Sequence, residues 1–410
     1  MSGFVEEVKP IDECLNIASA SLGFPWEVMT HELKLENSLS FRVASEIQSR
    51  EQSPPFTRSL RDGYAVKSAD TAGASQGSPV FLKISGEVAT GMKPDFEISR
   101  ETAAPIPTGG MLPDGADAVV MLEDTEKAGG WVEIRSSVQR GESLAFAGEE
   151  IEIGDVLIAK GEMIDCSILG LLAAFGVASV DVLDLKIGII STGDEITPVG
   201  MTTLQPGFIR DANTYIVRSA LKKYGFESES FGIASDRWED LKSRAEDAIQ
   251  KCDIVLLSGG SSVGAHDNTA LIMESLSAPG LIAHGINMAP GKPTIIGGSA
   301  NDKKLVVGLP GHPLSCMTSV LFVVIPMILA LAGSASKYAG RYMNMPLDSD
   351  VQGRTGIDEF IPMRVENGMA HPMAAKSGYV SAMRYADGFI RMRPHRETLR
   401  AGEDADVWLW

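Results

Sequence analysis

The sequence predicts a multidomain protein that combines a mainly parallel α/β domain with a β-rich domain, a helical domain and a small C-terminal β-barrel. Three observations lead to this prediction. The chain has 410 residues, too many for one hydrophobic core and enough for about two to four domains. Apolar strands alternate with helical patterns across residues 185–333. Short β-rich runs separated by Gly, Pro and Asp lie on both sides of that region.

Two separate segments are expected to form the helical domain. Residues 11–22 have apolar side chains at helical spacing, with acidic residues near the start. A second helix is expected around residues 168–175, with Asp165 or Ser167 as its N-cap and Gly176 at its C-terminal stop. We therefore assign residues 1–28 and 148–184 to this domain.

The segment between those halves is expected to be an inserted β-rich domain of residues 29–147. Short apolar runs at 80–84, 118–122 and 131–134 alternate with turn residues, as is typical of closely spaced strands. At the other end of the chain, residues 335–410 show short strands and turns that indicate a β-barrel-like domain.

Residues 185–334 are expected to form the α/β domain. Strands are predicted at 185–190, 228–234, 253–257, 294–296 and 304–307, and helices at 213–224, 237–251 and after Asp267. Continuous apolar strands indicate a mainly parallel sheet covered on both faces. Ligands of such sheets bind at the carboxyl ends of the strands, so the polar turns there are candidate sites.

Composition narrows the function. The net charge of −18 argues against nucleic acid as a partner, because phosphate binding needs clustered Lys and Arg. The apolar run at 320–332 contains Pro326 and is shorter than the about 20 residues of a bilayer span, so a buried helix is expected and no membrane partner. Four cysteines without a C-x-x-C pair and an N-terminus unlike a signal peptide predict a cytoplasmic protein with reduced thiols.

A glycine-rich turn at 258–267 follows the predicted strand 253–257 and precedes a helix. Its residues Ser258, Gly259, Gly260, Ser261, Ser262 and Gly264 form the pattern of a phosphate cradle, in which backbone N–H groups face an anion. Asp267 adds a carboxylate suited to hold a metal ion or a water. Alone, such a turn also serves to pack a helix on a sheet.

Three further turns carry polar residues. Asp194 and Glu195 are adjacent carboxylates that suit magnesium, although the start of an acidic loop or helix would show the same two residues. Asp236 is either a ligand or the cap of the next helix. Lys292, in a proline-stiffened turn, and Ser315, in the first turn of the apolar helix, suit an oxyanion, whereas His312 reads as a turn residue.

Taken together and in this order, these segments resemble the MoeA/gephyrin E-domain family, the molybdopterin molybdenumtransferases. The matching motifs span nearly the whole chain, at residues 62–66, 108–109, 112–120, 123–126, 148–151, 191–195, 209–213, 258–267, 290–293, 308–315 and 376–378. The resemblance implies an elongated homodimer, with the helical domain as the dimerisation domain. It also implies an enzyme that inserts molybdate into adenylylated molybdopterin, with a divalent cation, usually Mg²⁺, and releases AMP.

The resemblance also implies residue roles. The loop from Ser258 to Gly264 would hold the phosphates of adenylylated molybdopterin, and Asp236 and Asp267 would hold the metal. The molybdate pocket would be lined by Lys292, Pro293, Ser315 and Ser377. The cleft would be completed by Asp62, Thr108 and Glu195, with Asp62 contributed by the β-rich domain of one subunit or its partner. The adenylyltransferase of the same pathway is the expected protein partner.

The chain departs from the family pattern at three positions. Ala289 stands where lysine is frequent, His312 where asparagine is frequent, and Glu150 where aspartate is expected. The change at Ala289 leaves the preference between molybdate and tungstate open. Three alternatives also stay open: a tungstate-preferring insertase, a molybdopterin adenylyltransferase and a non-catalytic cofactor-binding scaffold.

Overall fold

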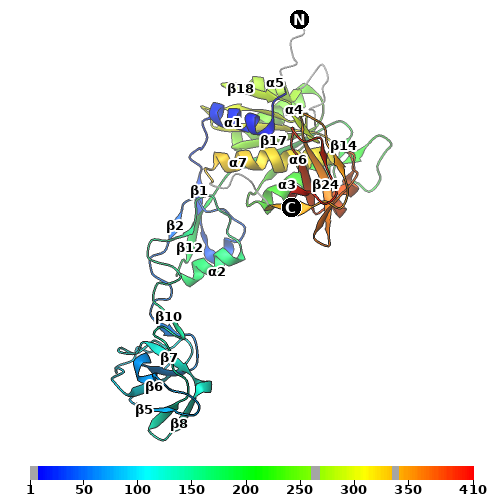
Figure 1. Ribbon diagram of the computed structural model, residues 1–410. Helices are drawn as coiled ribbons and strands as arrows, with labels where there is room; N and C mark the ends of the chain where they lie inside the picture. Colours follow the sequence, from blue (N-terminus) through cyan, green and yellow to red (C-terminus); the bar gives the residue numbers. More distant parts are fainter. Residues whose placement is uncertain (1–7, 260–267, 335–340) are drawn as a thin grey trace. The chain divides into compact units, whose positions relative to one another are not determined.

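The computed structural model describes residues 8–259, 268–334 and 341–410 (Figure 1). The chain forms two compact units, one comprising Met1–Glu46 with Ile158–Trp410 and the other comprising Ile47–Leu157. The first unit contains an α/β sheet and a separate β-sheet, and the second unit is rich in short strands. The predicted fold class, multidomain with mixed α/β and β-rich parts, is therefore confirmed.

A six-stranded sheet forms the centre of the first unit. Its strands, in spatial order, are β16 (Glu229–Ala234), β13 (Ile187–Thr192), β17 (Ile254–Ser258), β21 (Lys304–Leu309), β20 (Ile295–Ser299) and β18 (Pro279–His284). The first four strands are parallel, as the apolar runs predicted. The last two run antiparallel to their neighbours, and β18 was not predicted. The chain between β20 and β21 is too short for the crossover of a dozen or more residues that parallel strands require, so these strands form a hairpin.

Helices cover both faces of this sheet (Figure 1). One face is packed by α1 (Ile11–Leu22), α3 (Asn213–Lys223), α6 (Pro313–Ser319) and α7 (Ile325–Leu331), and the other by α4 (Trp238–Lys251) and α5 (Asn268–Glu274). Successive strand residues point to opposite faces, so Ile189 and Leu256 join the first core while Ile190 and Leu257 join the second. The strands are therefore apolar throughout.

The apolar helix predicted after residue 312 lies in the core. A π-helical turn, Val320–Val324, links α6 and α7 into one continuous element. Within the described part of the chain, Pro313–Leu331 is the one helix long and apolar enough to span a membrane, yet 89% of its most apolar window is buried in the protein. The expectation of a buried core helix is thus confirmed.

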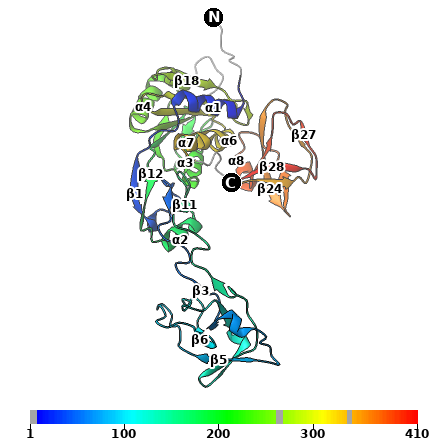
Figure 2. The same cartoon turned by 60° about the vertical axis from the view of Figure 1, so that its left-hand side comes forward.

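The second sheet of the first unit closes into a small barrel beside α6 and α8 (Val380–Tyr385) (Figure 2). Its order is β19 (Met288–Ala289), β24 (Asp358–Glu366), β26 (Gly388–Met392), β28 (Asp404–Leu409) and β22 (Arg341–Pro346). The strand β25 (Met369–Pro372) pairs with β24, and a bridge from Ala370 to Leu347 completes the ring. Phe360 stacks on Phe322 of the π-helical turn, with ring centroids 3.9 Å apart, and so fixes this sheet on the core helix.

The remaining part of the first unit is built on a strand pair, β1 (Thr30–Lys34) with β12 (Ser179–Leu183), and on the helix α2 (Cys166–Ala174). Of the two expected caps, Asp165 is the N-cap of α2, because its carboxylate accepts hydrogen bonds from the N–H groups of Ser167 and Ile168. Gly176 follows the helix with a φ of 69°, consistent with the expected stop.

The second unit is organised around another six-stranded sheet. The spatial order is β7 (Ala118–Met121), β4 (Gly63–Val66), β6 (Thr102–Ile106), β5 (Val80–Ile84), β9 (Trp131–Ile134) and β8 (Thr125–Ala128). The three runs singled out in the sequence are all strands of this sheet. Leu82, Val132 and Ile134 are completely buried on one of its faces and form the centre of the unit's core.

Candidate functional site

A cavity of about 1410 Å³ lies at the carboxyl ends of β13, β16, β17 and β21. It is lined by turns of the α/β sheet and by residues of the barrel, all within the first unit. The lining includes eight of the predicted site residues: Glu195, Asp236, Ser258, Gly259, Lys292, Pro293, Ser315 and Ser377. The cavity also includes Ala289 and His312, two of the positions that depart from the family pattern.

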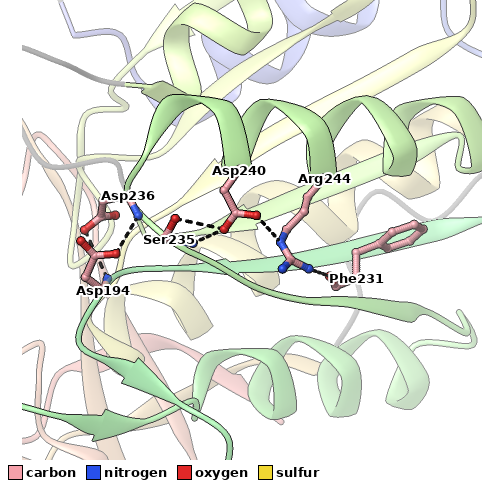
Figure 3. Close-up of polar contacts among 6 residues, drawn as sticks. All are labelled: Asp194, Phe231, Ser235, Asp236, Asp240 and Arg244. Carbon is pink, nitrogen blue, oxygen red and sulfur yellow. Dashed lines mark hydrogen bonds and ion pairs between the residues drawn. The ribbon is translucent and has the colours of Figure 1, made fainter.

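Hydrogen bonds to two carboxylates connect the turn after β13 with the turn after β16. The backbone N–H of Asp194 donates to Oδ2 of Asp236 at 3.3 Å, and the N–H of Asp236 donates to Oδ1 of Asp194 at 3.1 Å (Figure 3). Both side chains are exposed, so each carboxylate keeps oxygen atoms available for a cation or a water. The capping role considered for Asp236 is wrong, because Arg237 is the N-cap of α4 and no side chain caps this helix.

A second set of contacts fixes the backbone beside Asp236. The carboxylate of Asp240 accepts hydrogen bonds from the backbone N–H of Ser235 at 2.8 Å and from its hydroxyl at 3.0 Å (Figure 3). Arg244 donates to the other oxygen of Asp240 and to the carbonyl of Phe231. The Ser235 hydrogen bonds, with help from Arg244, lower the pKa of Asp240. This helix therefore presents Asp236 from a braced turn.

The described part of the glycine turn begins at the end of β17. Ser258 is 1% exposed, and Gly259 has a φ of 101°. A Cβ on Gly259 would lie 2.3 Å from the carbonyl oxygen of Thr192, so only glycine fits there. Burial raises the pKa of the neighbouring Cys316 thiol to about 12, which keeps the thiol protonated. The predicted site residues Gly260, Ser261, Ser262, Gly264 and Asp267 lie outside the described residues.

The turn that carries Lys292 is held between the core helix and the barrel. The hydroxyl of Thr318 in α6 lies 2.9 Å from the carbonyl oxygen of Pro290, and the hydroxyl of Thr294 donates to the carbonyl of Gly291 at 2.6 Å. Just before the turn, Ala289 pairs with Glu359 in the barrel sheet. The exposed Lys292 side chain is thereby supported at both ends of its turn.

Ser377 and His312 meet in the same cavity. The hydroxyl oxygen of Ser377 lies 3.0 Å from Nδ1 of His312, although the two residues are 65 positions apart. The backbone N–H of Leu314 donates to the carbonyl of Ser377 at 3.0 Å, which seats the barrel loop on the start of α6. His312 is thus a turn residue, as expected, with a side-chain partner that the sequence did not indicate.

Sequence reasoning missed two other cavity residues. Arg354 lines the cavity with a side chain that is 62% exposed, and its Nη2 lies 2.9 Å from Oε1 of Glu359. Asn213 is 8% exposed and donates through Nδ2 to the carbonyl of Gly311 at 2.8 Å. The motif at 209–213 pointed toward Asn213, whereas Arg354 lies in a turn without any periodic signal.

Asp62 and Thr108 belong to the second unit, where the structure brings them together. The backbone N–H of Thr108 donates to Oδ1 of Asp62 at 2.9 Å, and both residues are exposed. The Asp62 carboxylate therefore shapes the turn that carries Thr108.

The cavity is lined by both cationic and anionic side chains. Arg210, Lys292 and Arg354 supply cationic groups, and the strand ends supply carboxylates. Asp236 lines the cavity and, with Asp194 in the adjoining turn, offers the oxygen ligands that Mg²⁺ takes while it retains waters. Across residues 8–259, 268–334 and 341–410, no cluster of three or more His, Cys, Asp or Glu side chains forms a complete metal site. Such a cavity is equipped to bind an anionic ligand together with a hydrated cation.

Family models and a curated relative match the chain in the same order as its parts. The MoeA N-terminal region (domain I and II) matches residues 9–176, the probable molybdopterin binding domain matches 188–330, and the MoeA C-terminal region (domain IV) matches 344–410. The molybdopterin molybdenumtransferase of Staphylococcus aureus (strain Mu50) is 30% identical over 92% of this chain and 90% of its own length.

Solved structures give the same result. A molybdopterin biosynthesis MoeA protein from Pyrococcus horikoshii is similar over 98% of this chain and 99% of its own, with a TM-score of 0.75 and 36% identity. A second such structure from Pyrococcus horikoshii OT3 covers 98% of this chain and 100% of its own, with a TM-score of 0.82 and 26% identity. The similarity therefore extends over every domain.

Proposed function

Because this chain belongs to the MoeA family of molybdenum cofactor biosynthesis, we propose that it is a transferase that inserts molybdate into adenylylated molybdopterin, releasing AMP. Its relatives are named molybdopterin molybdenumtransferases. One observation carries the proposal. A single cavity holds Lys292 and Ser377 together with the carboxylates at the strand ends, and these are the groups that an oxyanion and a metal-bound phosphorylated ligand would require.

The oxyanion is proposed to bind around Lys292, Pro293, Ser315 and Ser377, with Arg354 as a further cation. Molybdate is a dianion, and the chain carries a net charge of −18, so binding requires a local cluster of cations and hydroxyl donors. The carbonyl contacts of Pro290 and Gly291 hold the Lys292 turn in place before the substrate arrives. Preorganised donors of this kind cost no rearrangement during the reaction.

The phosphates of adenylylated molybdopterin are proposed to bind at Ser258 and Gly259 and along the rest of the glycine turn. The adenylyl phosphoanhydride resists cleavage because its negative charge repels nucleophiles. Asp236, with Asp267, is proposed to hold Mg²⁺ beside that linkage, where the ion would neutralise the charge of the AMP leaving group. The Asp194–Asp236 contacts would orient the carboxylate, and Glu195 would face the same part of the cavity.

Asp62 and Thr108 are proposed to contribute to turnover as a pair, because the carboxylate of one residue fixes the backbone of the other. We propose a cytoplasmic homodimer that receives its substrate from the adenylyltransferase of the same pathway. The mass of the purified protein in solution tests the dimer. Transfer of adenylylated molybdopterin from the adenylyltransferase is tested by measuring how this intermediate distributes between the two enzymes.

The decisive experiment mixes purified protein with adenylylated molybdopterin, molybdate and Mg²⁺, and follows AMP release and activation of an apo-molybdoenzyme. Release of AMP that depends on molybdate supports the proposal. Consumption of ATP without added adenylylated ligand would indicate an adenylyltransferase instead, and tight cofactor binding without turnover would indicate a scaffold. Tungstate in place of molybdate measures the preference that Ala289 leaves open.

A point variant tests the oxyanion pocket. Lys292→Ala should raise the KM for molybdate at least about tenfold while leaving the fold intact, because it removes one charge-assisted contact. Lys223→Ala, an exposed lysine at the end of α3, is the matched control and should leave the KM unchanged. Equal KM values for the two variants would remove Lys292 from the proposed pocket.

A further inference from the structure

The contact between His312 and Ser377 is rigidly built. The amide of Asn213 donates to the carbonyl of Gly311 at 2.8 Å, and the backbone N–H of Cys316 donates to the carbonyl of His312 at 2.8 Å. On the other side, the Ser377 carbonyl accepts the N–H of Leu314 at 3.0 Å. The backbone on both sides of the 3.0 Å side-chain contact is therefore fixed by other hydrogen bonds.

The direction of this hydrogen bond depends on the proton at Nδ1 of His312. A serine hydroxyl has one hydrogen to donate and two lone pairs to accept with. When the imidazole is neutral and carries its hydrogen on Nε2, Nδ1 accepts the serine hydrogen, and the Ser377 hydroxyl has none left for a ligand. When Nδ1 carries a proton, it donates to the Ser377 oxygen, and the hydroxyl hydrogen is free to bind an oxyanion in the cavity.

We infer that His312 is a positioning residue that switches Ser377 into an oxyanion donor when Nδ1 is protonated. The inference rests on the proposed function, in which Ser377 contacts the tetrahedral oxyanion, and adds a proton-dependent control of that contact. Imidazole changes its charge between about pH 5 and pH 8, so oxyanion binding should strengthen as the pH falls across this range.

Other charged groups line the same cavity as His312. Lys292 and Arg210 are cations that line the cavity, and Glu195, Asp211 and Asp236 are carboxylates that line it. Glu359 is engaged by Arg354, so that pair contributes little net charge. A bound dianion would add negative charge beside His312 and thus favour the donating form of Ser377 at the moment of binding.

Titration calorimetry with molybdate alone, at about pH 6 and about pH 8, tests the inference. The affinity of the wild-type protein should be roughly tenfold higher at the lower pH, the equivalent of one hydrogen bond to a charged group. His312→Asn keeps an amide near the position of Nδ1 but does not titrate, so this pH difference should disappear. His395→Asn, an exposed histidine of the barrel, is the matched control and should retain it.

Ser377→Ala separates positioning from direct charge attraction. Loss of the pH difference in this variant supports action through the Ser377 hydroxyl, whereas a full pH difference without that hydroxyl overturns the inference. If the wild-type protein binds molybdate equally well at both pH values, the inference about His312 is overturned, but the proposed function is not. Wild-type protein that binds no molybdate at either pH overturns the proposed function as well. Near-ultraviolet circular dichroism of each variant confirms that it is folded.

Discussion

Gly259 ties the end of β17 to the end of β13, and its substitution should be costly. Gly259→Ala places a Cβ in a left-handed backbone conformation and 2.3 Å from the Thr192 carbonyl. The free energy of unfolding should fall by at least about 2 kcal/mol in urea titrations. Gly200→Ala, in open space without a positive φ, is the control and should change it by less than about 0.5 kcal/mol. Similar losses in both would contradict this packing argument.

Asp240 should stabilise the fold in a pH-dependent way. Hydrogen bonds from Ser235, aided by Arg244, lower its pKa in the folded state. A lowered pKa contributes stability that is present above the unfolded value of about 3.9 and is lost as the pH falls through the folded value. Wild type should therefore be more stable than Asp240→Asn at about pH 7, with the difference shrinking toward about pH 3 in urea titrations.

The control for that measurement lies on the same helix. Asp247 pairs with Lys251 on the exposed surface of α4, so Asp247→Asn removes a solvated ion pair. Its stability difference from wild type should be small at both pH values. If Asp240→Asn behaved in the same way as Asp247→Asn, the Ser235 contacts would not brace the turn that carries Asp236.

A buried ion pair between the neighbouring strands β24 and β26 supports the cavity wall. Nε of Arg391 lies 2.9 Å from Oδ1 of Asp358, with side-chain exposures of 3% and 4%. Asp358→Asn leaves a buried guanidinium without its counter-charge and should lower the free energy of unfolding by about 3 kcal/mol. Replacing both partners with Leu and Met should recover much of that loss. The exposed Asp406→Asn, which breaks the pair with Arg393, should cost less than about 1 kcal/mol in the same urea titrations.

Elements with local signals were predicted well from the sequence. The helix Ile11–Leu22 was expected with the same bounds, because its apolar spacing and the following Gly23 are local features. The strand β18 was missed, because its short apolar run, residues 281–283, directly follows Pro279 and Gly280, which are typical of a turn. The His312–Ser377 contact could not be predicted, since residues 65 positions apart meet only after the barrel has docked on the core helix.

At the scale of the whole molecule, the two units have separate cores. Leu82 is completely buried in the second unit and Leu256 in the first. Leu82→Ala should lower the stability of its own unit by about 3 kcal/mol and leave the first unit unchanged, because distant substitutions act independently. Leu256→Ala should lower the stability of the first unit and leave the second unit unchanged. Hydrogen exchange measured by mass spectrometry on peptides from each unit distinguishes the two effects, and loss of protection throughout the chain in either variant would contradict independence.

The pairing of β19 with β24 sets the order in which the cavity is completed during synthesis. The short strand Met288–Ala289 leaves the ribosome before its partner Asp358–Glu366, and domains generally fold from the N-terminal end of a growing chain. The turn with Lys292 therefore reaches its final support only after the barrel sequence has emerged. A nascent chain that has already folded its α/β sheet still lacks the barrel side of the cavity, so the pocket proposed for the oxyanion is completed only when the barrel has folded.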